Sequence, residues 1–275
     1  MKKSLLTASL ALLLLLPACG KEQPPLPSSP VQPVESQAEL PTPTPSPEPA
    51  ISDTPVPDPD PSPEAAVWGE LRYDQTFTAD DGAIVMLVTY AFPRLESAEH
   101  PAAEAINSYY TSQGEEFLSA AEETAQWGRA EYEIAVQSGF TYMPFVEELS
   151  FQMTRETEDY VSISREIYAN NGGAHPNTYA FSEQFSLDDG HRLYFADFFS
   201  DPDTALSRII STVESQAQDL GLNAGDATSV FQAEQFYITD EGFVFWLQGG
   251  ALAAQNSPIE FPVPYDDLSD LVKLW

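Results

Sequence analysis

From residue 67 onward the sequence predicts an α+β fold with mainly antiparallel sheets, helices packed on one face and two small consecutive subdomains. All 4 Trp, 12 Tyr and 16 Phe residues lie after residue 66, so this part has the apolar bulk that a core requires. It contains many short strand-like runs, several of them separated by acidic turns that end in Gly. Two longer stretches have apolar residues at helical spacing, which places helices between groups of strands.

The first elements expected are a hairpin and a helix. Residues 68–77 and 83–92 are strand-like and flank an Asp-Asp-Gly turn at residues 80–82. Residues 100–126 then carry apolar side chains on one helical face, although Gly114 leaves open a break into two helices. Four further strands, expected to form an antiparallel sheet, occupy residues 132–142, 146–154, 160–168 and 179–187.

The second half of this region begins with an apolar run at residues 193–199 and a helix expected over residues 203–220. Asp201 or Asp203 would cap this helix, and Pro202 suits its first turn. The remaining elements expected are strands at residues 235–239, 243–248 and 259–264 and a short helix at residues 265–271.

The N-terminus has the features of a lipoprotein signal. Lys2 and Lys3 precede an apolar stretch at residues 5–16, and the sequence Leu-Pro-Ala-Cys-Gly at residues 16–20 resembles a lipobox. Cys19 is the only cysteine, so it has no partner for an intramolecular disulfide, and we expect it to be lipidated. The alternative is cleavage after Ala18 and secretion. The lipoprotein reading places the protein at the cell membrane, lipid-anchored on the extracytoplasmic face, with the lipid as its only membrane contact.

Four segments are expected along the chain. They are the signal peptide and lipobox at residues 1–19, a disordered linker at 20–66, an N-terminal α+β subdomain at 67–154 and a C-terminal α+β subdomain at 155–275. The linker is acidic and contains 15 of the 24 prolines. Alternating proline favours extended polyproline II structure, so the linker has a reach on the order of 100 Å.

The net charge of −32 restricts the choice of partners. After residue 66 the chain still holds 35 acidic residues against 8 basic ones. A field of this sign repels nucleic acid and favours a cationic protein or another cationic ligand. The alternative is that the acidity serves solubility alone.

Sequence motifs for catalysis are absent from the chain. It has no His-Glu-x-x-His, no Gly-x-Ser-x-Gly, no Gly-rich phosphate loop and no cysteine cluster. The three histidines show no short paired spacing. We therefore expect no catalytic residues, no metal site and no cofactor, and a protein that is not an enzyme.

One loop between two aromatic-rich strands stands out as a candidate binding loop. Its candidate residues are Gly172, Gly173, His175, Pro176 and Asn177. The glycines permit positive φ, and Pro176 favours an extended His175. Histidine here would be a partner contact, a base or a metal ligand, or else a structural residue that bonds to backbone groups of the turn.

The same loop begins a family resemblance. Residues 172–177 (Gly-Gly-Ala-His-Pro-Asn), 185–190 (Phe-Ser-Leu-Asp-Asp-Gly), 196–199 (Ala-Asp-Phe-Phe), 236–245 and 262–268 agree in order and spacing with one family. They resemble the C-terminal part of the RsiV-type extracytoplasmic module, the domain of unknown function DUF3298. Residues 73–154 resemble more loosely its usual N-terminal partner, DUF4163.

This resemblance implies a module that also occurs in a lysozyme-sensing anti-sigma factor and in front of a peptidoglycan deacetylase domain. We expect neither an anti-sigma segment nor a deacetylase domain in this chain. The resemblance therefore implies a binding or scaffold protein of the bacterial envelope whose partner is a cationic, lysozyme-like protein or a peptidoglycan-associated ligand. One alternative is a cell-wall-modifying enzyme that uses His175 with a nearby carboxylate. Another is a purely structural wall protein.

Overall fold

The computed structural model describes residues 66–173, 175–252 and 256–273. The chain divides into Met1–Pro57 and Asp58–Trp275, and all described residues belong to the second unit. The predictions for the signal peptide, for Cys19 and for nearly all of the linker lie outside the described residues. Within the described part, no helix combines the length and the apolar character that crossing a membrane requires.

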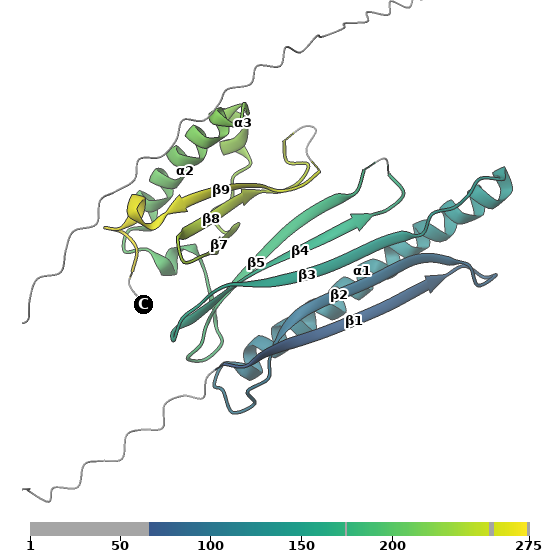
Figure 1. Ribbon diagram of the computed structural model, residues 1–275, viewed down its shortest axis with the longest axis horizontal. Coiled ribbons are helices and arrows are strands. Elements are labelled where there is room, and N and C mark those ends of the chain that lie inside the picture. The colour runs from purple at the N-terminus through teal and green to yellow at the C-terminus, as the bar shows by residue number, and fades with distance from the viewer. Residues whose placement is uncertain (1–65, 174, 253–255, 274–275) are drawn as a thin grey trace, which may run out of the picture. The chain divides into compact units, whose positions relative to one another are not determined.

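The larger sheet has six strands in the order β1-β2-β3-β4-β5-β6 (Figure 1). Its elements are β1 (Trp68–Thr78), β2 (Ile84–Leu95), the helix α1 (Ala103–Ser138), β3 (Phe145–Glu156), β4 (Tyr160–Asn170), β5 (Asn177–Ser186) and β6 (Arg192–Leu193). All neighbours are antiparallel except β2 and β3, which are parallel. The exception arises because α1 carries the chain back along the sheet before β3 begins.

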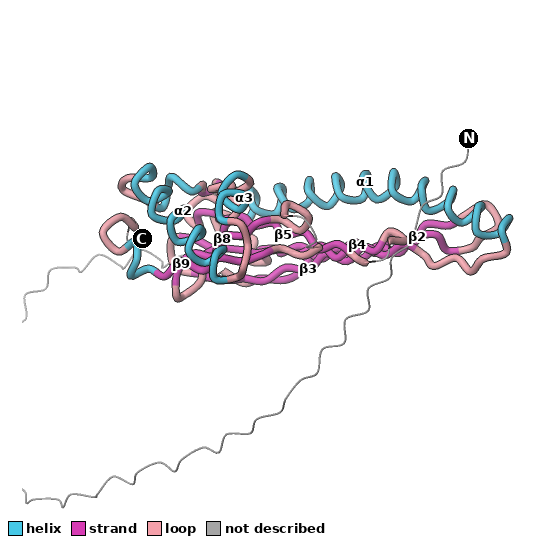
Figure 2. The backbone as a smooth tube through the Cα atoms, turned by 90° about the horizontal axis from the view of Figure 1, so that it is seen from above, coloured by secondary structure: helices cyan, strands magenta, loops and turns pink. Residues whose placement is uncertain are grey.

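The hairpin and the strands β3, β4 and β5 confirm the prediction, but the helix differs from it. Gly114 does not break α1, which is continuous from Ala103 to Ser138. The missing side chain at Gly114 instead leaves room for Tyr73, because a Cβ there would lie 2.2 Å from Cε2 of that ring. The prediction of a strand at residues 132–142 was wrong, because α1 continues to Ser138. Figure 2 shows this long helix running along one side of the strands.

The second group of elements forms a smaller antiparallel sheet with its own helices. It comprises η1 (Phe195–Phe198), α2 (Pro202–Asp219), α3 (Ala224–Ser229), β7 (Phe236–Ile238), β8 (Gly242–Leu247), β9 (Ile259–Pro264) and η2 (Tyr265–Leu268), with the strand order β7-β8-β9. The helix α2 confirms the prediction. Its N-cap is Asp201, whose carboxylate accepts a hydrogen bond from the Thr204 backbone N–H at 3.1 Å. The short helix α3 was not predicted.

Two hydrophobic cores underlie the two groups, as the predicted pair of subdomains requires. One packs α1 against β2, β4 and β5, and the other packs α2 against a dense cluster of phenylalanines from β7, β8 and β9. The boundary expected between residues 154 and 155 does not separate the two groups, because it falls within β3 and β3 pairs with β4 in the same sheet.

The smaller sheet contacts the larger one through the outer edge of β7, which pairs with no other strand. The Ile238 backbone N–H donates to the Ser162 hydroxyl at 2.9 Å, and the Phe236 carbonyl accepts hydrogen bonds from the side chains of Ser182 and Gln184. Ser162, Ser182 and Gln184 belong to β4 and β5. Alternation along the strands places these side chains on the face opposite α1.

The outer strands of both sheets carry residues that discourage further pairing. On β1 the edge residues Glu70, Arg72 and Asp74 are exposed, and Arg72 forms ion pairs with both acidic residues. On β9, Pro262 and Pro264 remove backbone donors. Charge and proline are recognised means of protecting sheet edges.

Candidate functional site

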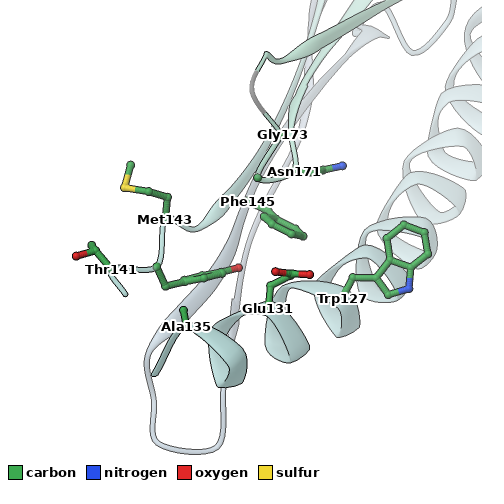
Figure 3. A pocket seen from close by; sticks show the side chains of 10 residues that line it. Trp127, Glu131, Ala135, Thr141, Met143, Phe145, Asn171 and Gly173 are labelled. Atoms are coloured by element: carbon green, nitrogen blue, oxygen red, sulfur yellow. The ribbon is translucent and has the colours of Figure 1, made fainter. Parts of the chain in front are cut away.

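A cleft lies where the C-terminal end of α1, the segment that follows it and the turn between β4 and β5 meet (Figure 3). We call it the tip cleft. It has a volume of about 670 Å³. The residues that line it are Trp127, Glu131, Ala135, Thr141, Tyr142, Met143, Phe145, Asn171, Gly172 and Gly173.

Two glycines with positive φ shape the chain around the tip cleft. Gly139 ends α1 with φ of 73°, and the Phe140 N–H returns to the Ala135 carbonyl at 2.9 Å, so the chain reverses there. Gly172 has φ of 79° in the turn between β4 and β5. A Cβ on Gly172 would lie 2.9 Å from Cε1 of Phe145, so this position needs glycine for conformation and for space.

Aromatic side chains form a rigid base for the tip cleft. Phe145 is buried, and its ring centroid lies 6.2 Å from that of Tyr142. The Tyr142 hydroxyl donates to the Val85 carbonyl at 2.8 Å, which fixes the segment after α1 to β2. Tyr132 packs edge-on against Tyr142 at 5.5 Å. The base is therefore held by contacts from three elements.

The rim, by which we mean the exposed apolar residues at or next to the cleft, is different: Trp127 and Met143 line the cleft, and Phe140 directly precedes the lining residue Thr141. Trp127, Phe140 and Met143 are 71%, 75% and 73% exposed, and Ile134 and Val136 on the same end of α1 are also exposed. Scattered single apolar residues on a surface are ordinary, but a group of this size at one end of the molecule is typical of an interaction site.

The charge around the tip cleft is negative. Among the described lining residues, Glu131 is the only charged one, and its carboxylate points across the cleft toward Phe145 in Figure 3. The Tyr132 hydroxyl donates to Asp81 at 2.7 Å, and this bond holds the pKa of the Asp81 carboxyl below its usual range. An ionised Asp81 thus lies close to the end of α1.

The structure places the predicted loop residues in different surroundings. Gly172 and Gly173 line the tip cleft, whereas His175, Pro176 and Asn177 are not among its lining residues. His175 is exposed and forms no hydrogen bond or ion pair with any other described residue. Asn177 begins β5 and pairs with Ala169. His191, not His175, lies beside a carboxylate, that of Asp189, at 2.5 Å.

Metal ligands do not gather anywhere in the described residues. No group of three or more His, Cys, Asp or Glu side chains in residues 66–173, 175–252 or 256–273 is arranged to hold an ion.

Sequence reasoning missed the rim residues because it ended the helix too early. A signal was present: the buried positions on the second half of α1 are Ala121, Ala125 and Gly128. When the buried stripe of a helix consists of small residues, large apolar residues such as Trp127 and Ile134 remain outside it.

Comparisons with known proteins support the predicted fold. A family model described as Deacetylase PdaC matches residues 81–178, from the β1–β2 turn to the start of β5, a stretch that contains the whole tip cleft. No curated protein matches the chain.

Two of the similar solved structures are DUF3298 family proteins. One, from Bacteroides fragilis, is 13% identical with a TM-score of 0.54 and covers 76% of this chain and 94% of its own. The other, from Pseudomonas aeruginosa, is 12% identical with a TM-score of 0.51 and covers 76% of this chain and 95% of its own. The chain therefore has the fold of these proteins, while the RsiV-type and DUF4163 assignments stay predictions.

Proposed function

We propose that the protein is a non-enzymatic binding or scaffold protein of the bacterial envelope, anchored through a lipid on Cys19 at the extracytoplasmic face. Its partner is a cationic, lysozyme-like protein or a peptidoglycan-associated ligand, bound at the tip cleft. The observation that carries the proposal is the exposed apolar rim, in which Trp127 and Met143 line this cleft and Phe140 lies next to it in the chain.

The apolar rim supports binding of a protein surface. Aromatic residues and Met are enriched at the centres of protein interfaces, where a few of them supply most of the binding energy. Phe140 and Met143 lie on the connection between α1 and β3, and that connection is fixed by the Tyr142 bond to Val85. A partner therefore meets side chains on a supported backbone, which lowers the entropic cost of binding.

The charge supports a cationic partner. Glu131 and Glu133 are exposed at the end of α1, and Asp81 lies beside it through its bond to Tyr132. The nearest basic residue on the helix, Arg129, is paired with Glu122 at 3.3 Å. Acidic groups around an apolar centre speed the approach of a cationic surface and orient it, so binding should weaken at higher salt.

The test is a calorimetric titration of the full chain in detergent with lysozyme, at low and at moderate salt. We expect binding that weakens with salt, and a loss of affinity of about tenfold or more for Trp127→Ala and for Phe140→Ala. Leu220→Ala is the matched control, because Leu220 is also an exposed apolar residue but lies at the end of α2. Absence of binding at both salt concentrations would remove the lysozyme-like partner from the proposal.

The second candidate is a cell-wall-modifying enzyme that uses His175 with a nearby carboxylate, although among the described residues the carboxylate of Asp189 contacts His191 and none contacts His175. The name of the matching family model, a deacetylase, is the observation that favours it. This candidate predicts that the purified protein changes the mass of muropeptides and that His175→Ala stops the change. Because His175 is exposed, this substitution should leave the fold intact. Unchanged muropeptide masses with the wild-type protein would rule the enzyme out.

A further inference from the structure

A second pocket lies where the turn between β3 and β4 meets η1, η2 and the segment after η2. We call it the basic pocket, because Arg155 and Lys273 both line it. It has a volume of about 220 Å³. Its floor consists of the rings of Tyr160, Phe198 and Phe243, which are buried in the second hydrophobic core. A ligand would therefore meet the side chains of the walls, among which Arg155 is half-buried and Lys273 is exposed.

A β-bulge directs Arg155 toward the smaller sheet, where the basic pocket lies. The strands β3 and β4 pair residue by residue up to Met153, but Arg155 is the next paired residue and lies opposite Ser162, so Thr154 is the extra residue of the bulge. Residues that lie opposite each other share a face of the sheet, and the face of Ser162 is the one that contacts β7. Without the bulge, alternation along β3 would turn Arg155 toward α1.

Contacts with neighbouring groups orient the Arg155 guanidinium and leave part of it free. Its Nη1 donates to the Thr239 carbonyl at 3.1 Å and to the Tyr265 hydroxyl. The guanidinium also lies over the rings of Tyr160 and Tyr265, at 5.9 and 5.1 Å from their centroids. Nε and Nη2 have no hydrogen-bond partner among the described residues, and neither atom is sealed from solvent. An oriented guanidinium therefore presents unused N–H donors at the pocket.

The positive charge of the basic pocket is unusual in this acidic chain, in which 35 acidic residues after residue 66 outnumber 8 basic ones. Four of the basic residues each pair with a carboxylate, namely Arg72, Arg129, Arg165 and Arg208. Arg155 and Lys273 form no ion pair with any described residue, although the exposed Asp266 also lines the pocket. A partly buried guanidinium without a counter-charge favours an anionic ligand.

We propose that the basic pocket binds a monocarboxylate with a small apolar body, either the end of a short peptide or a free organic acid. A planar carboxylate matches one edge of a guanidinium, and the free Nε and Nη2 of Arg155 form such an edge. Arg165 binds the Glu183 carboxylate through the same two nitrogens. The Lys273 ammonium adds a second charge, and its backbone is fixed because its N–H donates to the Phe198 carbonyl at 2.9 Å. The apolar body rests on Val272 and on the ring of Tyr265, which are both half-buried.

Other ligand chemistries fit the basic pocket less well. Inorganic phosphate carries more negative charge, which Asp266 and the acidic chain as a whole repel more strongly. A neutral or cationic ligand leaves Arg155 without a counter-charge. If Arg155 serves only to join the two sheets through Thr239 and Tyr265, the pocket binds no carboxylate. The inference does not depend on the proposed function, because the basic pocket and the tip cleft share no lining residue.

The test is a calorimetric titration of the full chain in detergent, at moderate salt, with N-acetyl-alanyl-alanine and with pentanoate. We expect at least one of them to bind. Binding of the peptide alone would identify a peptide end as the ligand, and binding of pentanoate alone a free organic acid. The amides of the two compounds lack the negative charge and should bind at least about tenfold more weakly.

Two variants test the two cations of the basic pocket. Lys273→Gln removes one charge, and Arg155→Lys keeps the charge but loses the planar edge, so each should weaken binding by about tenfold. Arg94→Gln is the matched control, because Arg94 is an exposed basic residue of β2 that does not line the pocket. It should leave binding unchanged.

Thermal unfolding of each variant identifies any loss of fold. Should Arg155→Lys not fold, Lys273→Gln still decides, because Lys273 is exposed. The proposal is overturned if neither carboxylate binds the wild-type protein, if the amides bind as tightly as the acids, or if the folded pocket variants bind no more weakly than Arg94→Gln. It is also overturned if inorganic phosphate binds and the carboxylates do not, since the pocket then takes a multiply charged anion.

Discussion

At the scale of single residues, the most unusual feature is a buried ion pair beneath α1. The side chains of Arg165 and Glu183 are 1% and 4% exposed, and the Arg165 Nε donates to Glu183 at 2.9 Å. The hydroxyls of Tyr109 and Tyr110 donate to the same carboxylate at 3.1 and 3.2 Å. The guanidinium also lies over four aromatic rings, those of Phe92, Tyr110, Phe117 and Phe181. Each member of the pair therefore depends on the other for its charge to be compensated.

Removing one partner should be costly. We expect Glu183→Gln to lower the free energy of unfolding by about 3–5 kcal/mol, because it leaves the Arg165 charge buried without a counter-charge. Urea unfolding measures the change. The control is Asp270→Asn, which breaks the exposed Arg208–Asp270 pair and should cost far less, because water screens the two charges. Equal losses in the two variants would contradict the prediction.

Little of this residue-level arrangement follows from the sequence. The contact between Arg165 and Glu183 depends on the register of β4 and β5, which the sequence does not show. Arg165 lies opposite Phe181 and Glu183 lies opposite Ile163, so the two charged residues are diagonal neighbours on one face of the sheet. The tip cleft is equally hard to predict from the sequence. Its residues come from α1, the segment after α1 and the β4–β5 turn, and the parallel pairing of β2 and β3 decides that these segments meet. Turn chemistry is local, so the sequence could single out Gly172 and Gly173, which the structure places in the lining of the tip cleft; their role in binding stays a prediction.

At the scale of elements, local signals predicted the hairpin, the strands β3 to β5 and the helix α2. They failed at the end of α1. Tyr132, Ile134 and Val136 alternate with polar or small residues, which is typical of a strand. A helix whose buried stripe consists of small residues also leaves Ile134 and Val136 exposed. Tertiary contacts, such as the Tyr132 bond to Asp81, favoured the helix.

The two glycine turns beside the tip cleft give a prediction with a built-in control. Gly139→Ala places a side chain at φ of 73° in open space, and it should cost about 1–2 kcal/mol of stability. Gly172→Ala carries the same conformational cost at φ of 79° and adds a contact of 2.9 Å with Phe145. We expect the larger loss for Gly172→Ala, measured by urea unfolding. Equal losses for the two variants would show that Phe145 moves away freely, and a smaller loss for Gly172→Ala would contradict the prediction.

At the scale of the whole molecule, buried tyrosines link stability to alkaline pH. Burial, followed by the Glu183 charge, raises the pKa of Tyr109 to about 12. Burial also raises the pKa values of Tyr90, Tyr110 and Tyr160. The unfolded chain loses these protons near pH 10, while the folded chain keeps them. The folded state is therefore favoured below about pH 10, and this advantage is lost as the pH rises.

Above roughly pH 10, we expect each of these tyrosines to lower the free energy of unfolding by up to about 1.4 kcal/mol for every pH unit. Urea unfolding at several pH values between roughly 8 and 11.5 measures this slope. Tyr109→Phe removes one titrating group and should make the slope shallower. A stability that stays constant across this range would contradict the pKa shifts.

The protected strand edges have a consequence for the proposed lipid anchor, which would hold copies of the protein close together on a membrane. Strand-to-strand pairing between copies is the common route to β-aggregates, and tethering raises the local concentration of copies. Here the edge of β1 is protected by the charged residues Glu70, Arg72 and Asp74, and the edge of β9 by Pro262 and Pro264. The edge of β7 already bonds to the hydroxyls of Ser162 and Ser182. Copies crowded by such an anchor would therefore stay separate molecules, each with its tip cleft free.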